Sequence, residues 1–63
     1  MNFNMQEFIY NKYSLSEKSD VYEFVENNIK RCLSEFLGEP DKQSTHTEYL
    51  VWRDIQRQLE KEQ

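Results

Sequence analysis

The segment from about Leu15 to Leu37 constrains the fold most, because its apolar residues recur at intervals of three and four. At about 100° per residue this spacing places them on one face of a helix, with Tyr22 and Phe24 at its edges. The apolar residues of that face are Val21, Val25, Ile29, Cys32, Leu33, Phe36 and Leu37. We therefore predict a long central helix with one face toward a core and the other toward water.

Both ends of this helix carry sequence signals. Ser14-Leu15-Ser16-Glu17 has the spacing of a capping box, in which a serine hydroxyl and a glutamate satisfy the free amides of the first turn. Gly38 can adopt the left-handed conformation that closes a helix, and Pro40 cannot continue it. We expect the helix to lie between these two signals.

A third helix is expected after the loop of residues 38–47. Thr45-His46-Thr47-Glu48 repeats the capping-box pattern, so the helix should begin near His46 and run toward Glu60, with a frayed last turn. Its apolar stripe has Tyr49 on the flank and Leu50 on the far side, and consists of Val51, Trp52, Ile55 and Leu59.

The first segment, residues 1–13, leaves two possibilities open. Met5, Phe8, Ile9 and Tyr13 form a broad apolar face if the segment is a short helix. The run Phe8-Ile9-Tyr10 also favours a strand, although no second convincing strand is present to pair with it.

The patterns together predict an all-α fold, a small three-helix domain that spans residues 1–63 as one unit. Its order is short helix, long central helix, loop and third helix. The expected core packs the central helix against the third, and consists of Val25, Ile29, Leu33, Phe36, Ile55 and Leu59.

A chain of 63 residues buries only about 60% of the surface that its unfolded form exposes, so its own core is marginal. With one cysteine and one histidine it has no evident disulfide or metal staple, which leaves association as the remaining source of stability. Its nine aromatic residues either fill a small core or form a patch for a partner.

No set of residues suggests catalysis, a cofactor, a metal or a small-molecule substrate. Cys32 lies in the apolar stripe, where burial raises a thiol pKa instead of activating it. His46 has no second histidine or cysteine at a ligand spacing, and is expected in the loop region at a helix start. One glycine cannot build a phosphate-binding loop, so we do not expect an enzyme.

The chain has no apolar run of 18 residues and no basic, apolar leader, so we expect a soluble cytoplasmic protein. A free thiol fits a reducing compartment. The formal net charge of −4 argues against general affinity for nucleic acid or an anionic membrane, since both are bound mainly through excess Lys and Arg.

Two charged features could serve either recognition or solubility. An acidic ridge winds along the start of the central helix, and consists of Glu17, Asp20, Glu23 and Glu26. A basic row lies on the third helix beside Leu50, and consists of Arg53, Arg57 and Lys61. Both patterns also occur on ordinary solvated helices.

The sequence therefore predicts a small protein–protein interaction module, a regulator or inhibitor that binds a larger protein, forms a homodimer through its helices, or does both. The candidate partner-binding residues are Tyr22, Glu23, Phe24, Glu26, Leu50, Arg53 and Arg57. Two alternatives remain: a helix-turn-helix-like nucleic-acid-binding protein that uses the third helix, and an acidic protein that blocks a nucleic-acid-binding groove on its target.

Overall fold

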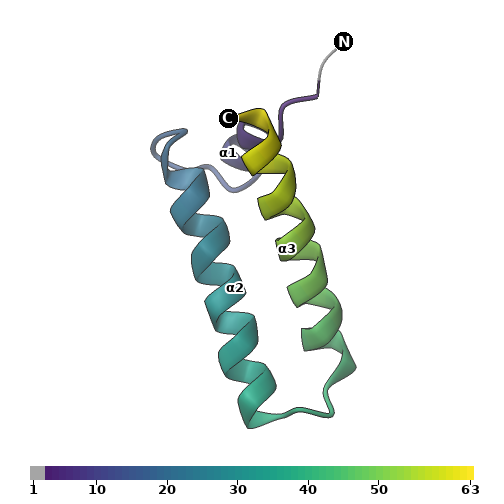
Figure 1. Cartoon of the computed structure of the whole chain (residues 1–63). Helices are drawn as coiled ribbons and strands as arrows, with labels where there is room; N and C mark the ends of the chain where they lie inside the picture. Colours follow the sequence, from purple (N-terminus) through teal and green to yellow (C-terminus); the bar gives the residue numbers. More distant parts are fainter. Residues whose placement is uncertain (1–2) are drawn as a thin grey trace.

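The computed structural model describes residues 3–63, which form three helices: α1 (Met5–Lys12), α2 (Asp20–Gly38) and α3 (Gln43–Glu62). α2 and α3 run antiparallel as a hairpin, and α1 packs against the end where α2 begins and α3 ends (Figure 1). The predicted all-α, three-helix fold is confirmed. The first segment is helical over Met5–Lys12, so the strand alternative for Phe8-Ile9-Tyr10 is wrong; Met1 and Asn2 lie outside the described residues.

The molecule is elongated, with principal extents of 39 × 23 × 17 Å. The long direction follows the hairpin, and its loop end, where α2 passes into α3, extends well beyond α1 (Figure 1). Within residues 3–63, none of the helices has the length and apolar character needed to cross a membrane.

The N-terminus of α1 is bonded to the last turn of α3. The Glu62 carboxylate accepts the Met5 N–H at 2.8 and 3.1 Å and the Gln6 N–H at 3.4 Å, while the Asn4 side chain caps the Glu7 N–H at 2.8 Å. These bonds hold the pKa of Glu62 below its ordinary value, with the Met5 N–H as the main cause. α3 therefore remains helical to Glu62, and the predicted frayed end is wrong.

The link between α1 and α2 contradicts the predicted capping box. Ser14 has φ 51°, in the left-handed region, and its N–H donates to Asn11 C=O at 3.4 Å. The Leu15 N–H donates to Tyr10 C=O at 3.1 Å, which completes the pattern that closes many helices at their C-terminus. Ser14 thus ends α1 instead of starting the next helix, and α2 begins at Asp20, later than expected.

α2 ends at Gly38, as predicted, but for a different reason. Gly38 does not have a positive φ; the last turn closes through the Glu39 N–H, which donates to Glu35 C=O at 2.8 Å. α3 begins at Gln43, before the expected start near His46. The second predicted capping box is also wrong, because Thr45 is buried in the first turn and the Glu48 carboxylate bonds to side chains elsewhere.

The core lies mostly between α2 and α3, and consists of Ile9, Val21, Val25, Ile29, Cys32, Trp52 and Leu59. The predicted core positions Val25, Ile29 and Leu59 are confirmed, and Ile55 is half-buried. Leu33 and Phe36, also predicted for the core, are 46% and 37% exposed. The reason is that α1 is too short to reach the loop end of the hairpin.

On α3, Val51 is 51% exposed and its predicted place in the apolar stripe is therefore wrong. It directly precedes the buried Trp52, and a step of about 100° from Trp52 turns it away from α2. Leu50 is 49% exposed on the far side, as expected.

Candidate interaction surface

The two sides of the α2–α3 hairpin use their side chains differently. On one side, α2 and α3 are joined by a polar network and an aromatic cluster. On the other side, the side chains that border the core are exposed or half-buried, apart from the buried Ile29. We call this second side the open face.

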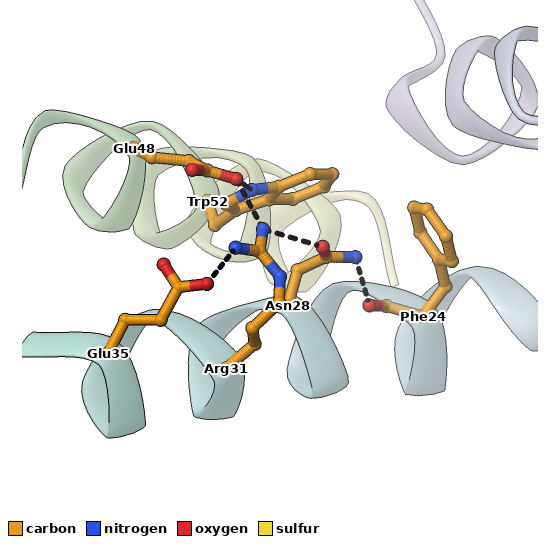
Figure 2. Close-up of polar contacts among 6 residues, drawn as sticks. All are labelled: Phe24, Asn28, Arg31, Glu35, Glu48 and Trp52. Atoms are coloured by element: carbon orange, nitrogen blue, oxygen red, sulfur yellow. Dashed lines mark hydrogen bonds and ion pairs between the residues drawn. The ribbon is translucent and has the colours of Figure 1, made fainter. Parts of the chain in front are cut away.

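Arg31 is the centre of the polar network (Figure 2). Its guanidinium donates to the Glu48 carboxylate across the helix pair, to Glu35 at 3.2 Å and to the Asn28 side-chain oxygen at 3.2 Å. The Trp52 indole N–H donates to the same Glu48 oxygen at 3.3 Å. One carboxylate on α3 thereby joins both helices.

The charges in this network support one another. Hydrogen bonds from Arg31 and then Trp52 lower the pKa of Glu48, while the bond to Glu48 raises the pKa of Arg31. Both members of the Arg31–Glu48 pair are more than 40% exposed, so solvent screens the pair and limits its contribution to stability.

Next to this network, three aromatic rings close the same side. The rings of Phe24, Tyr13 and Trp52 contact one another in a triangle, with centroid distances of 4.7 Å (Phe24–Tyr13), 5.8 Å (Phe24–Trp52) and 6.0 Å (Tyr13–Trp52). The Asn28 side chain donates to Phe24 C=O at 2.8 Å. Phe24 was expected at an uncovered edge, but it is half-buried in this cluster.

The open face consists of two stripes of residues that run along the hairpin. On α2 the stripe is Tyr22, Glu26, Ile29, Leu33 and Phe36; on α3 it is His46, Tyr49, Arg53, Gln56 and Glu60. In both stripes the intervals alternate between three and four residues, which is the spacing of a coiled-coil seam. Two surface hollows, each lined from both helices, show that the stripes lie on the same side.

The hollow near the loop is mainly apolar, with a volume of about 240 Å³. Its lining consists of Cys32, Leu33, Phe36, Thr45, His46 and Tyr49. The rings of Phe36 and His46 lie 6.2 Å apart, one from each helix. Leu37, which adjoins this end of the α2 stripe, is 83% exposed. This half of the open face therefore presents apolar area to water.

Cys32 borders this hollow but does not present a reactive group. The residue is fully buried, and desolvation raises the pKa of its thiol above the ordinary value. Its predicted place in the apolar stripe of the central helix is confirmed. His46, expected as a loop residue, lies in the first turn of α3 and is exposed.

The other half of the open face is charged. A second hollow of about 240 Å³ lies there between Tyr22 and Glu26 on α2 and Gln56 and Glu60 on α3. Glu26 pairs with Lys30 on its own helix at 3.4 Å. Arg53, on the α3 stripe, has no ion pair among residues 3–63. In this half, α2 therefore carries the acid Glu26, and α3 carries the base Arg53 together with the acid Glu60.

The seven candidate partner-binding residues divide among several surfaces. Tyr22, Glu26 and Arg53 belong to the open face. Leu50 and Arg57 follow the α3 stripe at its outer edge, and both are exposed. Glu23 is exposed one step outside the α2 stripe, and Phe24 lies on the opposite side.

The acidic ridge is shorter than predicted, because Glu17 precedes α2 and its N–H donates to the Asp20 carboxylate at 3.3 Å. Of the basic row, Arg57 lies 3.7 Å from Asp54 on its own helix. Neighbouring groups of the same chain therefore already contact part of the charge of the acidic ridge and of the basic row.

Sequence reasoning missed Leu33 and Phe36 as surface residues, because it assigned every apolar residue of the central helix to one core-facing stripe. The alternation of three and four residues from Tyr22 to Phe36 was the available signal. This alternation marks a second line of residues along α2, which lies beside the line of Val21, Val25 and Cys32 on the helix surface.

Among residues 3–63, no cluster of three His, Cys, Asp or Glu side chains could hold a metal ion. No protein-family model matches the chain, and no curated protein or solved structure shows significant similarity to it.

Proposed function

We propose that this chain is a protein–protein interaction module and that the open face is its binding surface. The observation that carries the proposal is the apolar end of that face, where Leu33, Phe36 and Leu37 are 46%, 37% and 83% exposed on consecutive turns of one helix. Contiguous apolar area of this kind on a small domain typically marks an interface.

The surrounding chemistry supports binding of a protein surface. Tyr49 and His46 adjoin the apolar residues, and aromatic side chains are enriched at interface centres. The shallow hollow offers about 240 Å³, below the range of about 300–1,000 Å³ typical of small-molecule sites. An apolar side chain or helix of another protein fits such a hollow better than an enclosed ligand. In this proposal the module regulates or inhibits the protein that it binds.

A face-specific capture experiment tests this proposal. The purified chain is immobilised, incubated with a lysate of its source cells, and the retained proteins are compared with those held by Leu33→Asp and Val51→Asp. Val51 is a matched control, because it is 51% exposed but lies outside the open face. We expect Leu33→Asp to lose the retained protein and Val51→Asp to keep it.

Equal capture by both variants would contradict the proposal, as would a parent chain that retains nothing and does not associate with itself. Circular dichroism of each variant controls for folding. Because Leu33 and Val51 are both exposed, neither substitution should disturb the helices.

Nucleic-acid binding through α3 stays a prediction from Arg53, Arg57 and Lys61. The pairing of Arg57 with Asp54 and the net charge of −4 both weaken it. We expect no salt-dependent retention of the parent chain on duplex DNA. Tight retention that falls with salt, and falls further when the three residues are neutralised, would favour this alternative.

A further inference from the structure

The spacing, level and charges of the residues on the open face bear on which molecule binds there. Resting on the proposed function, we propose that its occupant is a second copy of this chain, which packs its own open face against the first about a two-fold axis parallel to α2 and α3. The product is a four-helix arrangement in which α2 of each copy lies against α3 of the other.

The spacing of the two stripes suits packing against a second pair of helices. Both stripes of the open face alternate intervals of three and four residues, so their side chains stay on one line over more than two turns of helix. Side chains with this spacing interlock with another helix at the small crossing angle found in four-helix bundles. A pair of such seams on one face of a hairpin suits a second pair of helices.

Contacts between α2 and α3 fix which residues of the two helices lie at the same level along the hairpin. Three pairs span α2 and α3: Arg31 contacts Glu48, Phe36 lies beside His46, and Phe24 lies beside Trp52. The residue numbers of these pairs sum to 79, 82 and 76, so residues at one level have numbers that sum to about 79. Leu33 is therefore level with residues near 46, and Glu26 is level with residues near 53. Arg53 is therefore at the level of Glu26.

A two-fold axis parallel to the helices keeps each level unchanged while it exchanges α2 and α3. The apolar ends of the two copies then meet, with Leu33 and Phe36 of one facing His46 and Tyr49 of the other. At the charged end, Glu26 of one copy faces Arg53 of the other, and the pair occurs twice by symmetry.

The alternative isologous arrangement has its axis across the helices. In full overlap, that axis would place the apolar end of one copy over the charged end of the other, around Glu26 and Glu60. Apolar side chains would then face charges that lose water without gaining a partner. The Glu26–Arg53 pairs and the contact between the apolar ends thus both favour the parallel axis, which leaves Glu60 at the outer end of the face.

The size of the face fits a dimer. α2 has 19 residues. At about 1.5 Å per residue and about 10 Å of width per helix, the hairpin face measures roughly 28 Å by 20 Å, so two copies would bury roughly 1,100 Å² in total, just above the ~1,000 Å² expected of a biological interface.

Charge exchange tests the arrangement directly. Sedimentation equilibrium over a dilution series measures the association of three proteins, each alone: the parent, Glu26→Arg and Arg53→Glu. The same measurement is then made on an equimolar mixture of the two variants. In each variant alone, both inter-copy pairs join like charges, and we expect the dissociation constant to rise about tenfold or more. In the mixture, one variant has arginine at both positions 26 and 53, and the other has glutamate at both. Both inter-copy pairs of a heterodimer then join an arginine to a glutamate, so we expect the two variants to associate with each other.

The controls are Glu7→Arg and Lys18→Glu, which change the net charge equally at exposed positions outside the open face. They should leave the association of the parent unchanged. Circular dichroism confirms that every variant is folded, so that a loss of association reports on the face.

A parent chain that sediments as 7.8 kDa at every concentration would overturn the proposal, and so would a mixture that associates no better than its two components. These results are distinguishable from a failure of the proposed function. If the chain is monomeric but Leu33→Asp still loses a captured protein, the open face binds protein and its occupant is not a second copy.

Discussion

Ile29 and Leu33 provide a matched pair that tests how the hairpin divides core from surface. Both lie on α2, one turn apart, and replacement by alanine removes three carbon atoms from each side chain. Ile29 is 6% exposed, whereas Leu33 is 46% exposed. The two substitutions should therefore differ in cost although the sequence places both on one apolar face.

The magnitudes follow from burial. At about 0.8 kcal/mol per buried methylene, Ile29→Ala loses about 2.4 kcal/mol, and the cavity left between α2 and α3 raises the total to about 2.5–5 kcal/mol. Leu33→Ala loses about half the transfer free energy and leaves no cavity, so its cost is about 1 kcal/mol or less. For a chain of this size the free energy of unfolding is about 3–9 kcal/mol, so the first loss is severe and the second is mild.

Urea denaturation measures both costs, with the fluorescence of Trp52 as one probe and helical circular dichroism as the other. Trp52 is the only tryptophan and is 6% exposed between the two helices, so its emission reports on their separation. The experiment is run at a concentration low enough that self-association does not contribute. Equal losses for the two variants would refute the difference in burial between Ile29 and Leu33.

Further predictions concern the helix ends, acid pH and the thiol. Ser14→Gly should stabilise the chain by about 0.5–1 kcal/mol, because Ser14 has φ 51°, and thermal melts would refute this if the variant melted lower. Gly38→Ala should also stabilise it, by about 0.4–1 kcal/mol, since Gly38 has no positive φ and an added Cβ meets nothing within 4 Å; a loss of stability in urea would contradict this. Folding lowers the pKa of Glu48 below its ordinary value of 4.5, so the folded chain binds fewer protons than the unfolded chain in this pH range. The ionised Glu48 carboxylate therefore stabilises the fold above about pH 4.5, and this stabilisation is lost as the pH falls through the pKa of Glu48 in the folded chain. Unfolding measured from pH 7 to pH 3 should show a smaller loss in Glu48→Gln than in the parent. Burial raises the pKa of Cys32, so its thiol should react slowly with a disulfide reagent until urea unfolds the chain, and rapid modification of the folded protein would contradict its position.

The helical segments and part of the core could be predicted from the sequence, because helix periodicity depends on residues three and four apart. Val25, Ile29 and Cys32 repeat on one face whatever lies beside them, and all three are buried. The candidate site was predicted less well. Tyr22, Glu26 and Arg53 were identified, but Phe24 was assigned to a surface that it does not occupy, because its neighbours Tyr13 and Trp52 come from distant segments.

Local sequence therefore determined where helices form, and it determined the two seams of α2 through their spacing. Tertiary structure decided which end signals are used: Glu48 satisfies Arg31 and Trp52 instead of a helix start, and Glu62 caps α1. It also decided that Leu33 and Phe36 face water, because α1 ends after eight residues and covers only one end of the hairpin. A pattern within one helix records which residues share a face, whereas the burial of that face depends on the length and position of other helices.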